Sequence, residues 1–266
     1  MADNLRAEDG LDKLWGTSSA KGDVKAFPSD LDARTLSTKD VIRVWYGTTV
    51  PKYTQGKLTY DSDKLIAISA LAEAIHVNCK DEYLAGLWRK CIISGLLWAR
   101  RGPGAKATVY RCPPWSWASQ NSSVDYIIPV CESDDDGDGD SAYDCEVLAA
   151  EVETGKHNAF GNVKSGYVRL KIAILSAWAL RIPMTKTQPW YGEFECSLLL
   201  WDDTRPTSIP AIMDDDNWMA GRVVCALIGN KRLLVLQPVH PGSSKYRRVG
   251  IALKSLGETA TANNEN

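Results

Sequence analysis

The feature that most constrains the fold is a change of hydrophobic spacing at the turn signal Arg101-Gly102-Pro103-Gly104. Before this point, apolar side chains recur every three or four residues, which is typical of helices that bury one face. After it, short β-rich runs are separated by turn signals, which is typical of antiparallel strands. Helices followed by strands predict an α+β fold, in which an N-terminal helical segment packs on a mostly antiparallel β sandwich or barrel.

Three helices are predicted before the change of spacing. They begin near Ser37 or Thr38, at Asp61–Asp63 and at Glu82, and they end near Pro51, at Lys80-Asp81 and at Trp98. Ser, Thr and Asp are good N-caps, and proline ends or kinks a helix because it lacks the backbone N–H. Gly86 and Gly95 weaken the third helix.

The strand candidates lie between two polar tails. They cover residues 115–119, 124–130, 145–152, 166–180, 193–201, 222–228, 232–238 and 246–253. The predicted organisation is a disordered or irregular tail at 1–36, with a short turn of helix around Leu11 to Trp15, then a helical segment at 37–101. A β-rich domain follows at 102–256, with a disordered acidic loop at 132–144, and a disordered tail covers 257–266.

Composition predicts a cytoplasmic protein that binds neither nucleic acid nor membranes. The net charge is −2, so no global field attracts nucleic acid or an anionic membrane. No apolar run approaches the ~20 residues that a membrane-spanning helix needs, and the first residues lack the order of a secretory signal. The seven cysteines are odd in number and include no Cys-x-x-Cys pair, so we expect buried thiols in a reducing compartment rather than disulfides or a metal site.

No local catalytic motif occurs in the chain, so we predict no enzyme activity, no cofactor and no metal. The sequence has no Gly-x-Ser-x-Gly elbow, no phosphate-binding loop, no His-Glu-x-x-His and no dinucleotide fingerprint. His76, His157 and His240 lie far apart, although such distance does not exclude a site assembled by the fold. In the loop Glu132–Asp144, the residues Asp134, Asp136, Asp138 and Gly139 match positions one, three, five and six of a calcium loop, but the twelfth position is Cys145 and the flanks read as strands. We expect this loop to be flexible and to bind no metal tightly.

Five segments resemble a known family. Lys57-Leu58-Thr59 with Asp63-Lys64-Leu65, Tyr83-Leu84-Ala85-Gly86-Leu87-Trp88, Leu96-Leu97-Trp98, Trp115-Ser116-Trp117-Ala118-Ser119 and Tyr246-Arg247-Arg248-Val249-Gly250 are similar, in order and spacing, to the region that follows the HET domain in fungal heterokaryon-incompatibility proteins. The resemblance covers roughly Leu36 to Leu253. Ala70 stands where the family usually has glycine, and Pro114 is followed directly by Trp115.

The resemblance implies a part of that family without its killing activity. The HET domain, to which the family's growth arrest or cell death is attributed, has signatures that do not occur in this chain. We therefore expect a non-catalytic regulatory or interaction region, with a protein partner possible, in a fungal protein of non-self recognition. A truncated remnant and an enzyme with a dispersed active site are the alternatives.

The motif residues themselves read as structural. Trp115 and Trp117 on a strand are expected to point to one face and be buried, with Ser116 bonding a neighbouring segment from the other face. Thr59 or Asp61 is expected to cap a helix, Lys64 to pair with nearby acids, and Arg247 and Arg248 to lie on an exposed strand face. The alternatives are a ligand platform at the tryptophans and an anion site at the basic residues. The full set of structural residues is Leu58, Thr59, Asp63, Lys64, Leu65, Tyr83, Gly86, Leu87, Trp88, Trp98, Trp115, Ser116, Trp117, Ala118, Arg248, Val249 and Gly250.

Overall fold

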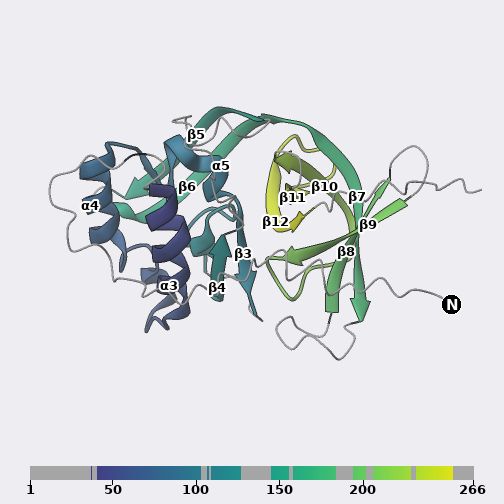
Figure 1. The fold of residues 1–266 in the computed structure, drawn as a ribbon, viewed down its shortest axis with the longest axis horizontal. Coiled ribbons are helices and arrows are strands. Elements are labelled where there is room, and N and C mark those ends of the chain that lie inside the picture. Colours follow the sequence, from purple (N-terminus) through teal and green to yellow (C-terminus); the bar gives the residue numbers. More distant parts are fainter. Residues whose placement is uncertain are drawn as a thin grey trace, which may run out of the picture.

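The chain has an α+β fold with a large share of strand. The computed structural model describes residues 37, 41–102, 107, 109–126, 145–155, 158–183, 194–201, 206–228 and 232–253. The helices lie at the left of Figure 1 and a β-barrel lies at the right. A long hairpin, β5 (Cys145–Gly155) and β6 (Asn158–Ile172), runs along the top of this view and leads into the barrel. The predicted acidic loop and the predicted turn of helix at Leu11–Trp15 lie outside the described residues.

The barrel is closed and consists of six antiparallel strands, as the sequence predicted for the β-rich part. They are β7 (Ile174–Pro183), β8 (Phe194–Trp201), β9 (Pro206–Met213), β10 (Gly221–Ile228), β11 (Arg232–Pro238) and β12 (Tyr246–Leu253). Their order around the barrel is β7-β8-β9-β12-β11-β10, so two three-stranded meanders close on each other. Small inward side chains such as Ala177, Ala179 and Cys225 fill the interior with a packed core, which suits a narrow barrel.

The N-terminal part is built from short elements around a second core. They are η1 (Ile42–Thr49), α3 (Val50–Gln55), η2 (Asp61–Asp63), α4 (Ser69–Cys79), β1 (Tyr83–Leu84), β2 (Leu87–Trp88), η3 (Arg89–Cys91), α5 (Ile92–Gly95), β3 (Trp98–Arg101), η4 (Trp117–Ser119) and β4 (Ser123–Tyr126). β3 and β4 pair antiparallel, with Trp98 opposite Tyr126, across the boundary predicted at residue 101. Four tryptophans, Trp45, Trp88, Trp98 and Trp117, are fully buried in this core. No helix of the described segments has both the length and the apolar character needed to cross a bilayer.

The prediction that Pro51 ends or kinks the first helix is wrong. The helix continues to Gln55, and Pro51 lies in the first turn of α3. The preceding segment, Ile42–Thr49, has π-helical geometry, which changes the hydrogen-bond register ahead of the proline. The first turn of a helix tolerates proline because the N–H there has no intrahelical partner to lose.

The second helix begins later than predicted, and its expected caps are not used. Asp61–Asp63 forms a separate 3₁₀ turn without a side-chain cap, and α4 starts only at Ser69. Thr59 is exposed. The helix ends at Lys80, whose left-handed backbone (φ 49°) stops it.

The helix predicted for residues 82–98 is wrong. The segment begins with a β-hairpin, continues through η3 and one turn of helix (α5), and ends in strand β3. The hairpin turn is Ala85-Gly86, with φ values of 49° and 98°, which matches the type I′ turn of two-residue hairpins. Leu84, Leu87, Cys91 and the residues beside them are buried on every side. Uniform burial explains why their spacing did not distinguish strand from helix.

The strand predicted for residues 115–119 is also wrong, and one strand of the barrel was not predicted. Trp117–Ser119 is a 3₁₀ turn that begins at Ser116. The missed strand, β9, begins at Pro206 and contains Pro210, and proline argues against a strand in a sequence.

The barrel is attached to the rest through its outward side chains. Ile212, Ala226, Ile228, Leu234 and Ile251 point out of the barrel and belong to the same core as the N-terminal tryptophans. Within the barrel, β12 lies close to β9 at this face, because a Cβ added to Gly250 would lie 2.7 Å from the Ile212 carbonyl oxygen. This face of the barrel is therefore part of the core of the whole molecule.

Two buried arginines, one from each side, form hydrogen bonds across this attachment. Arg100 of β3 donates from Nε to the Met213 carbonyl and pairs with Asp216. Arg248 of β12 donates to the Trp98 carbonyl, and its guanidinium lies 3.2 Å from the centre of the Trp98 ring. Arg248 is 2% exposed, so the prediction of an exposed arginine on β12 is wrong for this residue and holds for Arg247.

The Arg248 charge is balanced inside the protein. The Asp214 carboxylate lies 3.4 Å from Arg248 Nη2, and both side chains are 1% exposed. Burial lowers the pKa of Arg248 to about 10, while Asp214 and Tyr126 act in the opposite direction. The guanidinium therefore lies between a carboxylate, a carbonyl and an indole face, which replace part of its hydration.

We expect Arg248→Ala to lower the free energy of unfolding by about 3–5 kcal/mol, because it leaves the Asp214 carboxylate buried beside a cavity. Urea denaturation followed by circular dichroism measures this change. Arg247→Ala is the matched control, since Arg247 is exposed and bonds only Gln237 on the surface. It should change stability by no more than about 0.5 kcal/mol. Equal effects of the two substitutions would contradict the buried role of Arg248.

Candidate functional site

The residues that carry the family resemblance meet around one buried carbonyl, that of Gly86. Trp45 Nε1 donates to this oxygen at 2.8 Å and Trp117 Nε1 donates to it at 2.9 Å. A carbonyl oxygen has two lone pairs, so both indoles are satisfied at one point. A Cβ at residue 86 would lie 2.6 Å from Trp117 Nε1, so only glycine allows this approach and the φ of 98°.

Ser116 fixes the segment that carries Trp117. Its Oγ donates to the Ala85 carbonyl at 2.6 Å and accepts from the Ala118 N–H at 3.1 Å. The first bond agrees with the expectation that Ser116 bonds a neighbouring segment, and the second caps the 3₁₀ turn. Trp117 is fully buried, as expected, whereas Trp115 is only partly buried. The two rings therefore do not form the exposed platform considered as the alternative.

Lys64 joins the same network and does not pair with acids as predicted. Its Nζ donates to the Gln120 carbonyl and lies 6.0 Å from the centre of the Trp117 ring. Arg111 donates to the same carbonyl and also to those of Ala118 and Asp61. Within the described part of the chain, Lys64 has no ion pair. Burial, followed by the nearby Arg111 charge, lowers the pKa of Lys64 to about 8.

The structure brings nearly all the predicted structural residues into this network or its core. Among them, Thr59 is exposed and Leu58, Asp63 and Trp115 are partly buried, whereas the others are buried. Trp98 links the network to the barrel attachment, because its Nε1 donates to the Trp115 carbonyl at 2.9 Å and its ring stacks on Arg248. Residues 150 positions apart therefore meet. The sequence pattern missed Trp45, Arg100 and Arg111, for which no local signal pointed to these contacts.

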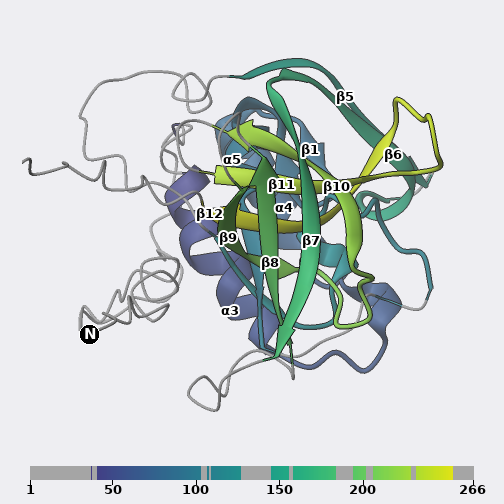
Figure 2. The ribbon, with the colours of Figure 1, turned by 90° about the vertical axis from the view of Figure 1, so that its right-hand side faces the viewer.

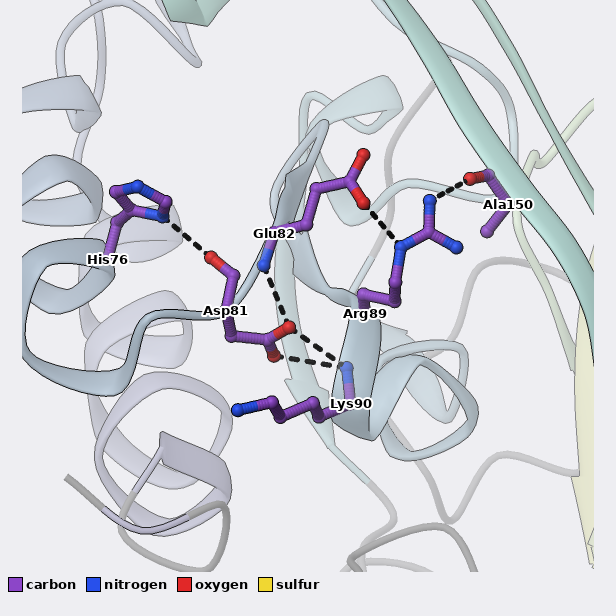
Figure 3. Close-up of polar contacts among 6 residues, drawn as sticks. All are labelled: His76, Asp81, Glu82, Arg89, Lys90 and Ala150. Atoms are coloured by element: carbon purple, nitrogen blue, oxygen red, sulfur yellow. Dashed lines mark hydrogen bonds and ion pairs between the residues drawn. The ribbon is translucent and has the colours of Figure 1, made fainter.

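One group of residues has the composition of a catalytic site. His76 and Cys79 at the end of α4, and Asp81 just after it, lie within six residues of each other. His76 Nδ1 bonds the backbone carbonyl of Asp81 at 2.7 Å, not its carboxylate (Figure 3). Asp81 Oδ1 accepts from the Glu82 N–H at 2.8 Å, and Oδ2 accepts from the Lys90 N–H at 3.0 Å.

These contacts fix the base of the β1–β2 hairpin. The Asp81 carboxylate joins the residues before and after the hairpin, and Arg89 ties it to β5 through Glu82 and the Ala150 carbonyl (Figure 3). Burial raises the pKa of the Cys79 thiol, so the thiolate needed for nucleophilic attack is disfavoured. The hydrogen bonds of His76 and Asp81 are therefore those of a structural cap on the hairpin.

Other chemical groups lie apart. Over the residues that the structure places, no three His, Cys, Asp or Glu side chains gather as a metal site. Burial raises the pKa of Cys112 to about 11, and of Cys196 and Cys225 to about 12. No disulfide joins the six cysteines that the structure describes. Cys131 and His157 lie outside the described residues.

The outer face of the barrel offers a surface of a different kind. On β7, Ala177 and Ala179 point inward, while Trp178 and Leu180 point outward and are 49% and 37% exposed. Trp178 lies opposite Arg222 of β10 and Leu199 of β8. We name this surface the open wall and define it by the outward residues Ser176, Trp178, Leu180, Leu199, Arg222 and Val224. Figure 2 looks onto it, with β7 and β8 in front.

No protein-family model, curated protein or solved structure matches the chain.

We expect Trp117→Ala to lower the free energy of unfolding by about 3–5 kcal/mol, because it empties a fully buried site and leaves Gly86 with one donor. The matched control is Trp178→Ala on the open wall, where an exposed indole should contribute no more than about 1 kcal/mol. Denaturant titrations of both variants measure the two values. A loss of stability below about 1 kcal/mol for Trp117→Ala would contradict the burial of this tryptophan.

The stability of the chain relative to Lys64→Met should rise with pH. Because the folded pKa of about 8 lies below the ordinary 10.5, the unfolded chain binds more protons between these two values. The stabilising contribution of a neutral Lys64 is thus fully present above its ordinary pKa of 10.5. It is lost as the pH falls through the folded-state pKa of about 8. From about pH 7 to about pH 9.5 the wild type should gain about 2 kcal/mol over Lys64→Met. A difference that stays constant to within about 0.5 kcal/mol would contradict a desolvated Lys64.

Proposed function

We propose that this chain is a non-catalytic interaction region related to the part of fungal heterokaryon-incompatibility proteins that follows the HET domain. The observation that carries the proposal is that the five similar segments, far apart in sequence, meet in one buried network from Lys64 to Arg248. Segments that resemble a family only by chance have no reason to touch one another. The helical segment, packed on the barrel, and the barrel itself act as one module in this proposal.

The absence of catalysis is part of the same proposal. Several side chains of the motifs, among them Ser116, Trp117 and Arg248, bond backbone carbonyls, so these polar atoms serve the fold. Backbone groups also bond the His76 ring and the Asp81 carboxylate, in the group that contains Cys79. A cytoplasmic setting agrees with the absence of disulfides among the described cysteines.

The open wall is the surface that we propose for a protein partner. Exposed aromatic and aliphatic side chains in one row are typical of protein interfaces, and here they include Trp178 beside Arg222, two residue types enriched in binding hot spots. The alternative, an enzyme with a dispersed site, can be tested at His76 and Cys79, which belong to the group with the composition of a catalytic site. Loss of a measured activity in Cys79→Ser, with the fold intact, would favour that alternative.

Expressed alone in a fungal host, the chain should cause neither growth arrest nor cell death. The killing activity is assigned in the family to a domain whose signatures are missing here, and the described side chains provide no substitute. Induced expression, with a full-length HET protein as the positive control, gives the measurement. Cell death at comparable abundance would mean that the activity resides in the helical part or the barrel. The killing chain with Cys79→Ser would then test the enzyme alternative.

A further inference from the structure

The open wall has room for one helix-sized segment. The residues that define it lie on the neighbouring strands β10, β7 and β8, and two spacings of ~4.8 Å between strands give a width of about 10 Å. An eight-residue strand is about 26 Å long, so the wall covers roughly 260 Å². A stable interface between globular proteins buries about 800 Å² on each partner, whereas a helix with its side chains is about 10–12 Å wide. The wall thus suits one amphipathic segment better than a second globular surface.

The positive charge of the open wall favours a bound segment that carries acidic side chains. Arg222 is exposed and is the one charged side chain among the residues that define the wall. It lies directly opposite Trp178, so a segment that covers the indole also brings its own charges near the guanidinium. A complementary segment combines apolar side chains at helical spacing with acids beside them.

The N-terminal sequence of this chain has that composition. Leu11, Leu14 and Trp15 are spaced i, i+3 and i+4, as on one face of a helix. Three acids, Glu8, Asp9 and Asp12, lie among or just before them. These residues lie outside the part of the chain that the structure describes, so the match rests on their sequence.

The connection is long enough to reach the wall. Residues 16–36 join this segment to the described part of the chain, and 21 residues extend up to roughly 70 Å. A compact protein of this length has a radius of gyration of about 18 Å, which corresponds to roughly 50 Å across. A tether of this length raises the local concentration to the millimolar range, so even weak contacts would be occupied.

We propose that the segment Leu11–Trp15 covers the open wall of the same molecule, with Leu11, Leu14 and Trp15 on Trp178 and Leu180 and the acids toward Arg222. The segment then competes with an external partner for the wall. This inference rests on the proposed role of the wall as an interaction surface, and it gives the chain an intramolecular control of that surface.

Hydroxyl-radical footprinting with mass spectrometry tests the proposal on the full chain. In the triple variant Leu11→Ser, Leu14→Ser, Trp15→Ser, the modification rate of Trp178 should rise about threefold or more, because the indole loses its cover. Met219 and Tyr246, exposed elsewhere, should keep their rates. Leu256→Ser, which removes an apolar side chain from the other end of the chain, should leave Trp178 unchanged.

A charge exchange tests the orientation. Arg222→Glu should raise the Trp178 rate as the triple variant does, and adding Asp9→Lys with Asp12→Lys should restore protection. Equal Trp178 rates in the wild type and the triple variant would overturn the proposal. Protection that disappears on dilution would also overturn it, because a second copy would then be the cover. Neither failure bears on the expression test above, so the two proposals can fail separately.

Discussion

The rest of the N-terminal structure depends on the Gly86 carbonyl and the two indoles that bond it. The oxygen is buried at a turn whose backbone conformation requires positive φ, and without donors it would cost about 1–3 kcal/mol. Trp45 from the first helix and Trp117 from the 3₁₀ turn supply these donors, so three segments are fixed at one atom. Ser116, bonded to the adjacent Ala85 carbonyl, keeps Trp117 in place. The hairpin therefore acts as the centre on which the helices and the later turn assemble.

The barrel is joined to this centre by polar groups placed inside an apolar contact. Burying two guanidinium groups is costly, and here each one gains a backbone carbonyl from the facing segment and a nearby carboxylate. Apolar packing by residues such as Ile228 and Ile251 contributes buried area, but it does little to fix the orientation of the barrel against the N-terminal part. The arginines fix this orientation, because their hydrogen-bond donors match only one register of β3 against β9 and β12. Register fixed in this way explains how Trp98 and Arg248 can stack so closely.

How far the sequence predicts this structure depends on whether a segment has one buried face or several. The barrel strands alternate between an inward and an outward side, and β8, β10, β11 and β12 were predicted almost to the residue. Apart from Arg89 and Lys90, residues 83–98 are buried, so their spacing did not distinguish helix from strand. The motif around Trp117 alternates like a strand but is a 3₁₀ turn, because Ser116 caps it. For the site, the sequence indicated the residues but not their contacts. Arg248 was expected on the surface, since its partner Asp214 lies in an unrelated segment.

Burial also separates the side chains that stabilise the fold from those that are available for binding. Ser116, Trp117 and Arg248 bond backbone groups, and most of the motif side chains are buried, so their replacement should affect stability before it affects recognition. The barrel has two different sides. One carries Ile212, Ala226 and Leu234 into the core, and the other presents Trp178 and Leu180 to solvent. Both sides belong to the same closed ring of strands, so a substitution on the open wall can alter binding without loosening the attachment. Recognition can thus vary on a barrel whose position is fixed by its opposite side.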